Sequence, residues 1–111
     1  DARNYNGTAG FQTTEARALR DFLISHKSQG GQTVLVDLHG WLNETIGDNE
    51  LGSYYRAQYG MSTHIPSYGT GYLINWARST LGARSVLVEL PEYNANSTSY
   101  INATLNMLRS I

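Results

Sequence analysis

The chain has 111 residues, a formal net charge of −1 and no cysteine. This length predicts one domain or part of one, and the absence of cysteine excludes disulfides, thiol catalysis and cysteine-ligated zinc sites. The balanced charge gives no basic surplus for nucleic acid, and no apolar run is long enough to span a membrane, so neither nucleic acid nor a membrane span is expected.

The chain opens with a polar loop, which is followed by a predicted helix and a predicted strand. Thr13 or Thr14 is a suitable N-cap for a helix that runs to about His26. Residues 33–38 (TVLVDL) form a short apolar run typical of a buried strand, and His39 follows at its carboxyl end. The apolar residues of the helix recur at helical spacing and predict one apolar side, made of Ala16, Leu19, Phe22 and Leu23.

The middle of the chain predicts two further helices separated by short irregular stretches. Residues 43–49 are rich in turn formers and predict a loop, and residues 50–59 have helical spacing and precede a glycine that can end a helix. Residues 61–65 predict a short strand before a proline. A glycine-containing loop is expected over residues 67–71, and a helix over residues 72–81.

The last part of the chain predicts a buried strand and a final helix. Residues 85–91 (SVLVELP) are apolar apart from Glu89, which lies near the carboxyl end of the strand. Asn96 or Ser97 is a suitable cap for the helix that follows. Its apolar positions predict a core-facing side of Ile101, Leu105 and Leu108. The alternation of helices and strands predicts an α/β fold with a mixed or parallel sheet layered between helices.

Two predicted strands end in titratable side chains, His39 and Glu89. In open α/β sheets, ligands bind outside the carboxyl ends of the strands, so these two residues are candidates for one site. A neutral imidazole can ligate zinc, and a nearby carboxylate can take a proton from a zinc-bound water. Asp37 could orient the imidazole. The alternatives are a satisfied strand-end histidine and a glutamate that has already turned into solvent.

Several short motifs, taken together, resemble the C-terminal half of the zinc carboxypeptidases of the carboxypeptidase A superfamily. They occur in the family's order and cover most of the chain: Tyr5-Asn6-Gly7, Thr14-Glu15, VDLHGW (residues 36–41), GYLINWA (71–77), Leu81-Gly82-Ala83 and VELP (88–91). The resemblance implies that residues 1–111 are the C-terminal portion of a single zinc-carboxypeptidase-like catalytic domain with part of a carboxypeptidase-like fold. The Glu-Leu-Pro ending is more similar to bacterial members that trim cell-wall peptides.

The resemblance implies roles for five residues. His39 matches the third zinc ligand, and Glu89 matches the general base and acid that activates the metal-bound water. Tyr68 lies near the family's substrate-capping tyrosine, and Ile74 falls where the family lines its side-chain pocket. Arg3 matches part of the pair that binds the substrate carboxylate. The chain lacks the family's His-X-X-Glu motif, so the remaining zinc ligands are expected upstream.

These observations predict the C-terminal fragment of a secreted zinc metallocarboxypeptidase, a hydrolase of peptide or cell-wall-peptide (peptidoglycan) C-termini. The fragment is expected to be inactive alone. The expected partners are the substrate and the N-terminal half of the same enzyme, and the separated piece is expected to self-associate through exposed apolar surface. An extracellular or cell-envelope location is expected. The alternative is a non-catalytic α/β module that binds a peptide or saccharide through its aromatic loops. A serine hydrolase is disfavoured because no Gly-X-Ser-X-Gly motif occurs.

Overall fold

The computed structural model describes residues 10–27, 29–91 and 97–111. The chain divides into two compact units, Asp1–Thr33 and Val34–Ile111. The first unit contains one helix, and the second contains the sheet and the other helices. Within the described ranges, no helix has both the length and the apolar character that a membrane crossing requires.

Helix α1 (Thr14–His26) confirms the first predicted helix. Thr13 is its N-cap, because the backbone is extended there and the side-chain oxygen accepts a hydrogen bond from the amide of Ala16 at 3.0 Å. The predicted apolar side is present, but no residue of α1 is buried, and Leu19 and Phe22 are 43% and 56% exposed. The helix is therefore fixed by its local sequence rather than by burial in a core.

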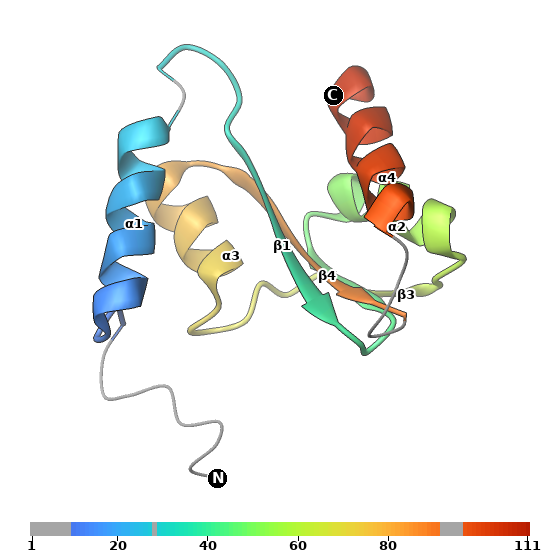
Figure 1. The fold of residues 1–111 in the computed structure, drawn as a ribbon, viewed down its shortest axis with the longest axis horizontal. Helices are drawn as coiled ribbons and strands as arrows, with labels where there is room; N and C mark the ends of the chain where they lie inside the picture. The colour runs from blue at the N-terminus through green and yellow to red at the C-terminus, as the bar shows by residue number, and fades with distance from the viewer. Residues whose placement is uncertain (1–9, 28, 92–96) are drawn as a thin grey trace, which may run out of the picture. The chain divides into compact units, whose positions relative to one another are not determined.

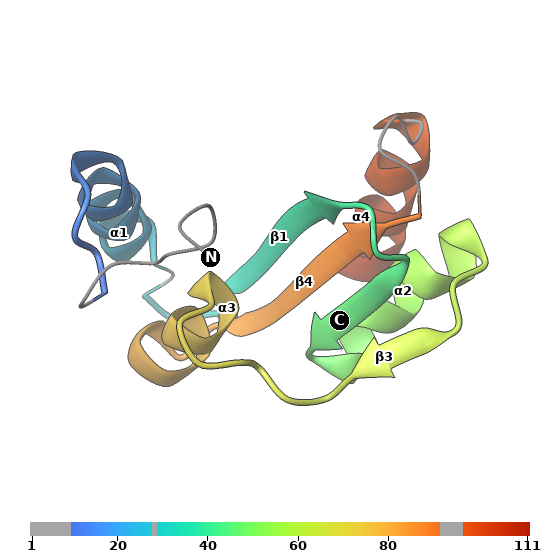
Figure 2. The same cartoon turned by 90° about the horizontal axis from the view of Figure 1, so that it is seen from below.

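The second unit is built on a four-stranded sheet with the order β1-β4-β2-β3. The strands are β1 (Val34–Gly40), β2 (Glu44–Gly47), β3 (Thr63–Ile65) and β4 (Arg84–Leu90). β1 and β4 run parallel, β2 runs antiparallel to β4, and β3 runs parallel to β2. Figure 2 shows β4 lying beside β1 along its length. The sheet is mixed, as predicted.

Helices cover both faces of this sheet (Figure 1). α2 (Asn49–Tyr59) and α4 (Ser97–Ser110) contribute to a core with Val86 and Val88 on one face. α3 (Leu73–Trp76), continued by the π-helical turn η2 (Ala77–Leu81), packs Ile74 against Leu87 on the other face. Successive residues of a strand point to opposite faces, so β4 needs an unbroken apolar run because it is covered on both.

The predicted loop over residues 43–49 was wrong, because Glu44–Gly47 form strand β2. Thr45 is fully buried and Ile46 is 7% exposed, since β2 lies inside the sheet between β3 and β4. Glu44 pairs with Glu89, far along the sequence. The strand is short and lies among turn-forming residues, so its pairing rather than its local pattern makes it a strand.

The predicted core-facing side of α4 was also wrong. Ile101, Leu105 and Leu108 are 48%, 41% and 53% exposed, whereas Ala103 and Met107 are buried at 0% and 1% exposure. The helix carries apolar residues on two sides, and the side with the small Ala103 is the one that packs into the core with Tyr55 and Val88. The larger apolar side chains therefore lie at the surface.

Candidate functional site

The carboxyl ends of β1 and β4 bring together the two titratable residues that the sequence singled out. His39 pairs in register with Glu89 across the parallel strands, and Glu89 pairs with Glu44 of β2. Paired residues of neighbouring strands lie on the same face, so all three belong to one face of the sheet. His39 Nε2 lies 3.0 Å from Asp37 Oδ1, and Asp37 is two residues earlier on the same face.

This cluster contains polar contacts, but the described residues do not form a zinc site. Asp37 already contacts Nε2 of His39. Glu89 Oε2 is buried with no hydrogen-bond partner among the described residues. No group of three or more histidine, aspartate or glutamate side chains in the described ranges is placed to hold a metal ion. Catalytic zinc sites use three protein ligands.

His64 does not join this cluster, because it lies on the opposite face of the sheet. Thr45 follows Glu44 on β2, so it points to the other face, and its register partner on β3 is His64. His64 Nδ1 lies 2.9 Å from the Thr45 hydroxyl and 3.1 Å from the guanidinium of Arg56. A guanidinium only donates, so Nδ1 accepts and the ring is the neutral, Nε2-protonated tautomer.

This polar group on the α2 side of the sheet makes stability depend on pH. Burial lowers the pKa of His64 below its ordinary 6.5, and the charge of Arg56 lowers it further. Weaker opposing effects come from backbone hydrogen bonds at Gly47 and Thr45 and from the charge of Asp48. Between pH 6.5 and the lowered pKa of the folded state, His64 therefore binds a proton in the unfolded chain but not in the folded one. Over this range the proton stabilises the unfolded chain. Above pH 6.5 both forms are neutral and His64 contributes no pH dependence.

We expect the free energy of unfolding to fall as the pH decreases from 6.5 towards the lowered pKa of His64. A His64→Gln variant should lose less stability over this range, because its side chain does not titrate. Urea unfolding of both proteins between pH 5 and pH 8 measures the difference. His26→Gln is the matched control, since His26 is an exposed histidine of α1. Equal pH slopes for the wild type and His64→Gln would contradict the prediction.

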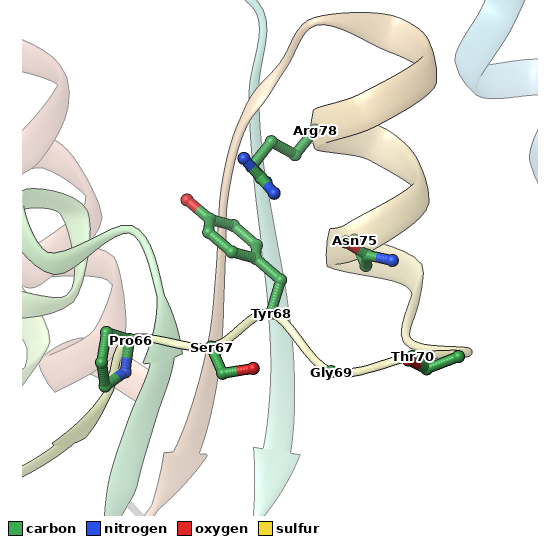
Figure 3. A pocket seen from close by; sticks show the side chains of 7 residues that line it. All are labelled: Pro66, Ser67, Tyr68, Gly69, Thr70, Asn75 and Arg78. Carbon is green, nitrogen blue, oxygen red and sulfur yellow. The ribbon is translucent and has the colours of Figure 1, made fainter.

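A second candidate site is an open cleft of about 420 Å³ beside α3 and η2 (Figure 3). The loop between β3 and α3 forms one wall, and two side chains of the helical segment form the other. Its lining residues are Pro66, Ser67, Tyr68, Gly69, Thr70, Asn75 and Arg78. Arg78 is the charged residue of the cleft, and its guanidinium carbon lies 4.3 Å from the centre of the Tyr68 ring.

The packing of Tyr68 holds one wall of this cleft in place. Its ring lies against Gly47, where an added Cβ would meet it at 3.1 Å and the Ser85 carbonyl at 2.9 Å. Gly47 also has φ of +105°, so this close approach requires glycine. Burial and the charge of Asp48 raise the pKa of the Tyr68 phenol, while Arg78 and Arg84 oppose this. The phenol is therefore neutral at physiological pH.

Ile74 and Arg3 were expected to bind substrate together with Tyr68. Ile74 is fully buried and packs against Leu87 and Ile46 beneath the sheet, so its side chain does not line the cleft. Arg3 lies outside the described residues. Of the expected substrate-binding residues, the structure therefore places Tyr68 on an open surface.

Sequence reasoning missed Arg78 as a site residue. It follows Asn75 by three positions, and side chains at this spacing lie on one side of a helix. That spacing could have suggested that both residues face one surface. The approach of Arg78 to Tyr68 depends on the path of the loop through Gly69 and Gly71, whose φ values are +78° and +85°. This path has no simple sequence signal.

Comparison with known proteins finds similarity between this chain and one part of a bacteriocin. No protein-family model matches the chain. The chain is similar to Bacteriocin BCN5 of Clostridium perfringens, with 34% identity over 103 residues, which make up 90% of this chain and 11% of the relative. The chain therefore spans only a small part of that protein.

This similarity overturns the functional expectation from the short motifs. The resemblance to a zinc carboxypeptidase was wrong, because the relative that matches along most of the chain is a bacteriocin. The prediction of a peptide hydrolase, with its metallopeptidase and peptidoglycan assignments, was wrong for the same reason. The alternative of a peptide- or saccharide-binding module gains no support from this relative either. The α/β fold class stands, but its carboxypeptidase-like part is not confirmed.

Proposed function

We propose that this chain is a folded part of a bacteriocin-type antibacterial protein. The observation that carries the proposal is the 34% identity to Bacteriocin BCN5, which extends over 90% of this chain rather than over one short motif. The matched segment includes most of an α/β unit with cores on both faces of its sheet, so the similarity concerns a folded element. Action on other bacteria requires export, which agrees with the expected extracellular location.

Within this function, the cleft beside α3 is the surface best suited to contact a target molecule, and the contact is with an anionic group. Arg78 supplies a positive charge, and none of the described residues that line the cleft carries a carboxylate. Among the described residues, Arg78 forms no ion pair, so its charge is available to a ligand. The ring of Tyr68 beneath the guanidinium restrains it by a cation–π contact.

The polar neighbours of Arg78 are also suited to binding an anionic group. Ser67, Thr70 and Asn75 carry hydroxyl and amide groups that can donate hydrogen bonds to carboxylate or phosphate oxygens. A guanidinium pairs with such groups through two parallel hydrogen bonds, which give both strength and orientation. The neutral Tyr68 phenol adds no repulsion. The cleft therefore has the charge and donors that recognition of a carboxylate or phosphate requires.

Growth inhibition tests the antibacterial proposal. The polypeptide that carries this segment should inhibit the growth of susceptible bacteria when it is added from outside. A Val88→Asp change should reduce that inhibition at least about tenfold, because it places a charge in a fully buried core position. Purified, folded protein that inhibits none of a broad panel of bacteria would overturn the proposal. Undiminished inhibition by Val88→Asp would show that this unit is not needed.

The role of the cleft is tested by a separate change. Arg78→Gln should weaken growth inhibition by about tenfold or more, because one charged hydrogen-bonding contact is typically worth about 1.5–3 kcal/mol. Arg109→Gln is the matched control, since Arg109 is an exposed arginine on α4 and away from the cleft lining. Thermal unfolding of both variants checks that the fold is unchanged. Equal inhibition by the two variants would remove the cleft from the mechanism and leave the antibacterial proposal intact.

A further inference from the structure

Within the described residues of the second unit, strand β1 forms a long edge of the sheet. It has seven residues and pairs with β4 on one side, whereas the opposite edge strand, β3, has only three. An edge strand presents a row of unpaired N–H and C=O groups that can bind another strand. The exposed apolar side chains Leu38, Trp41 and Leu42 lie at or just after its end, with exposures of 40%, 60% and 65%.

We propose that this edge binds the β1 strand of a second copy of the same chain. The two strands run antiparallel about a two-fold axis perpendicular to the sheet, which joins the two four-stranded sheets into one. Such a contact uses the same surface on both copies, the commonest arrangement in homodimers. Main-chain hydrogen bonds between the two strands supply the pairing, as in other cases of strand addition.

The polar side chains of β1 favour one register for this pairing. In a register centred on Leu38, Asp37 of each copy lies opposite His39 of the other, on the face where these side chains already meet at 3.0 Å within one chain. In a register centred on Asp37, two carboxylates lie opposite each other. Opposed side chains in antiparallel strands are close neighbours, and like charges there are destabilising. Of these two registers, the one centred on Leu38 is the one that makes the edge complementary to itself.

The same register uses the apolar residue at the exposed end of β1. The two Leu38 side chains lie opposite each other across the axis and shield one another from water. Leu38 alternates with Asp37 and His39, so it lies on the other face of the sheet from them. The dimer therefore combines an apolar contact on one face with two Asp–His contacts on the other. The short β3 edge offers no comparable length of pairing.

Sedimentation equilibrium of the 111-residue chain tests the association. The expected result is a concentration-dependent monomer–dimer equilibrium that shifts at least about tenfold towards monomer in Leu38→Lys. Ile65→Lys is the control, because Ile65 is an exposed apolar residue on the opposite edge strand. Circular dichroism checks that both variants are folded. A monomer at all concentrations, or equal weakening by the two variants, would overturn the proposal.

Two further measurements test the register. The chain contains no cysteine, so Leu38→Cys introduces a single thiol, and mild oxidation should cross-link the dimer more efficiently than in Ile65→Cys. Asp37→His and His39→Asp should each weaken dimerisation, and the double exchange should restore it, because the opposed pairs are then again Asp with His. Equal cross-linking at both positions, or no recovery in the double variant, would contradict this register. If a longer polypeptide covers β1 with one of its own segments and remains monomeric, that result would refute the proposed dimer.

Discussion

Replacing Asp48 with alanine should lower the free energy of unfolding by about 2–3 kcal/mol, since it removes a helix cap and a partly buried ion pair together. Asp48 is the N-cap of α2, and its Oδ1 accepts a hydrogen bond from the amide of Leu51 at 3.0 Å. Arg84 at the start of β4 donates to both of its oxygens, at 2.9 and 3.0 Å. One carboxylate therefore fixes the start of a helix to the start of the central strand.

Two matched variants separate these contributions. Asp48→Asn keeps a good N-cap but removes the charge, so it should cost less than Asp48→Ala. Glu50→Ala removes the other carboxylate that contacts Arg84, at 2.8 Å, but this side chain is 61% exposed, and its loss should cost under about 1 kcal/mol. Urea unfolding at pH 7 gives all three values. A cost for Glu50→Ala equal to that of Asp48→Ala would contradict the assigned order.

The same ion pair has a consequence at low pH. Burial alone would raise the pKa of Asp48, but the hydrogen bonds from Arg84 and the Leu51 amide outweigh it, so the pKa lies below its ordinary 3.8. A lowered carboxyl pKa contributes stability that is fully present above pH 3.8 and is lost as the pH falls through the folded-state value. Asp48 therefore makes the free energy of unfolding depend on pH below 3.8, whereas His64 makes it depend on pH just below 6.5.

The sequence predicted those parts of the fold whose signals are local. The apolar runs of β1 and β4, the N-cap at Thr13 and the stop at Gly60 act through neighbouring residues, so they can be recognised without knowing the fold. β2 could not be recognised in this way. Its four residues become a strand because β4, more than thirty residues later, hydrogen-bonds to them. A short strand among turn formers takes its structure from this distant partner.

The candidate sites also differ in how far the sequence could predict them. The proximity of His39 and Glu89 followed from a general rule, that parallel strands bring their carboxyl ends to one edge. The contact between Tyr68 and Arg78 depends on a loop path that no local pattern specifies. The step from His39 and Glu89 to a peptidase was wrong, because short motifs of common residue types recur in unrelated proteins. Agreement over 103 residues carries more information than these motifs do.

A direct test can show which side of α4 packs into the core. Met107→Ala should lower the free energy of unfolding by about 2–4 kcal/mol, because it leaves a cavity in a well-packed core. Met107 is 1% exposed and belongs to the cluster that joins α2, α4 and β4. Truncating a buried side chain of this kind removes contacts that the surrounding residues cannot fully replace.

Leu108→Ala is the matched control, because Leu108 is the adjacent residue on the same helix and has a similar size. It is 53% exposed, so its truncation should change the free energy of unfolding by no more than about 1 kcal/mol. Chemical unfolding of both variants under identical conditions measures the difference. A larger loss for Leu108→Ala than for Met107→Ala would mean that the apolar side of Ile101, Leu105 and Leu108 faces the core. The helical spacing of those three residues would then have identified the core-facing side correctly, contrary to the structure.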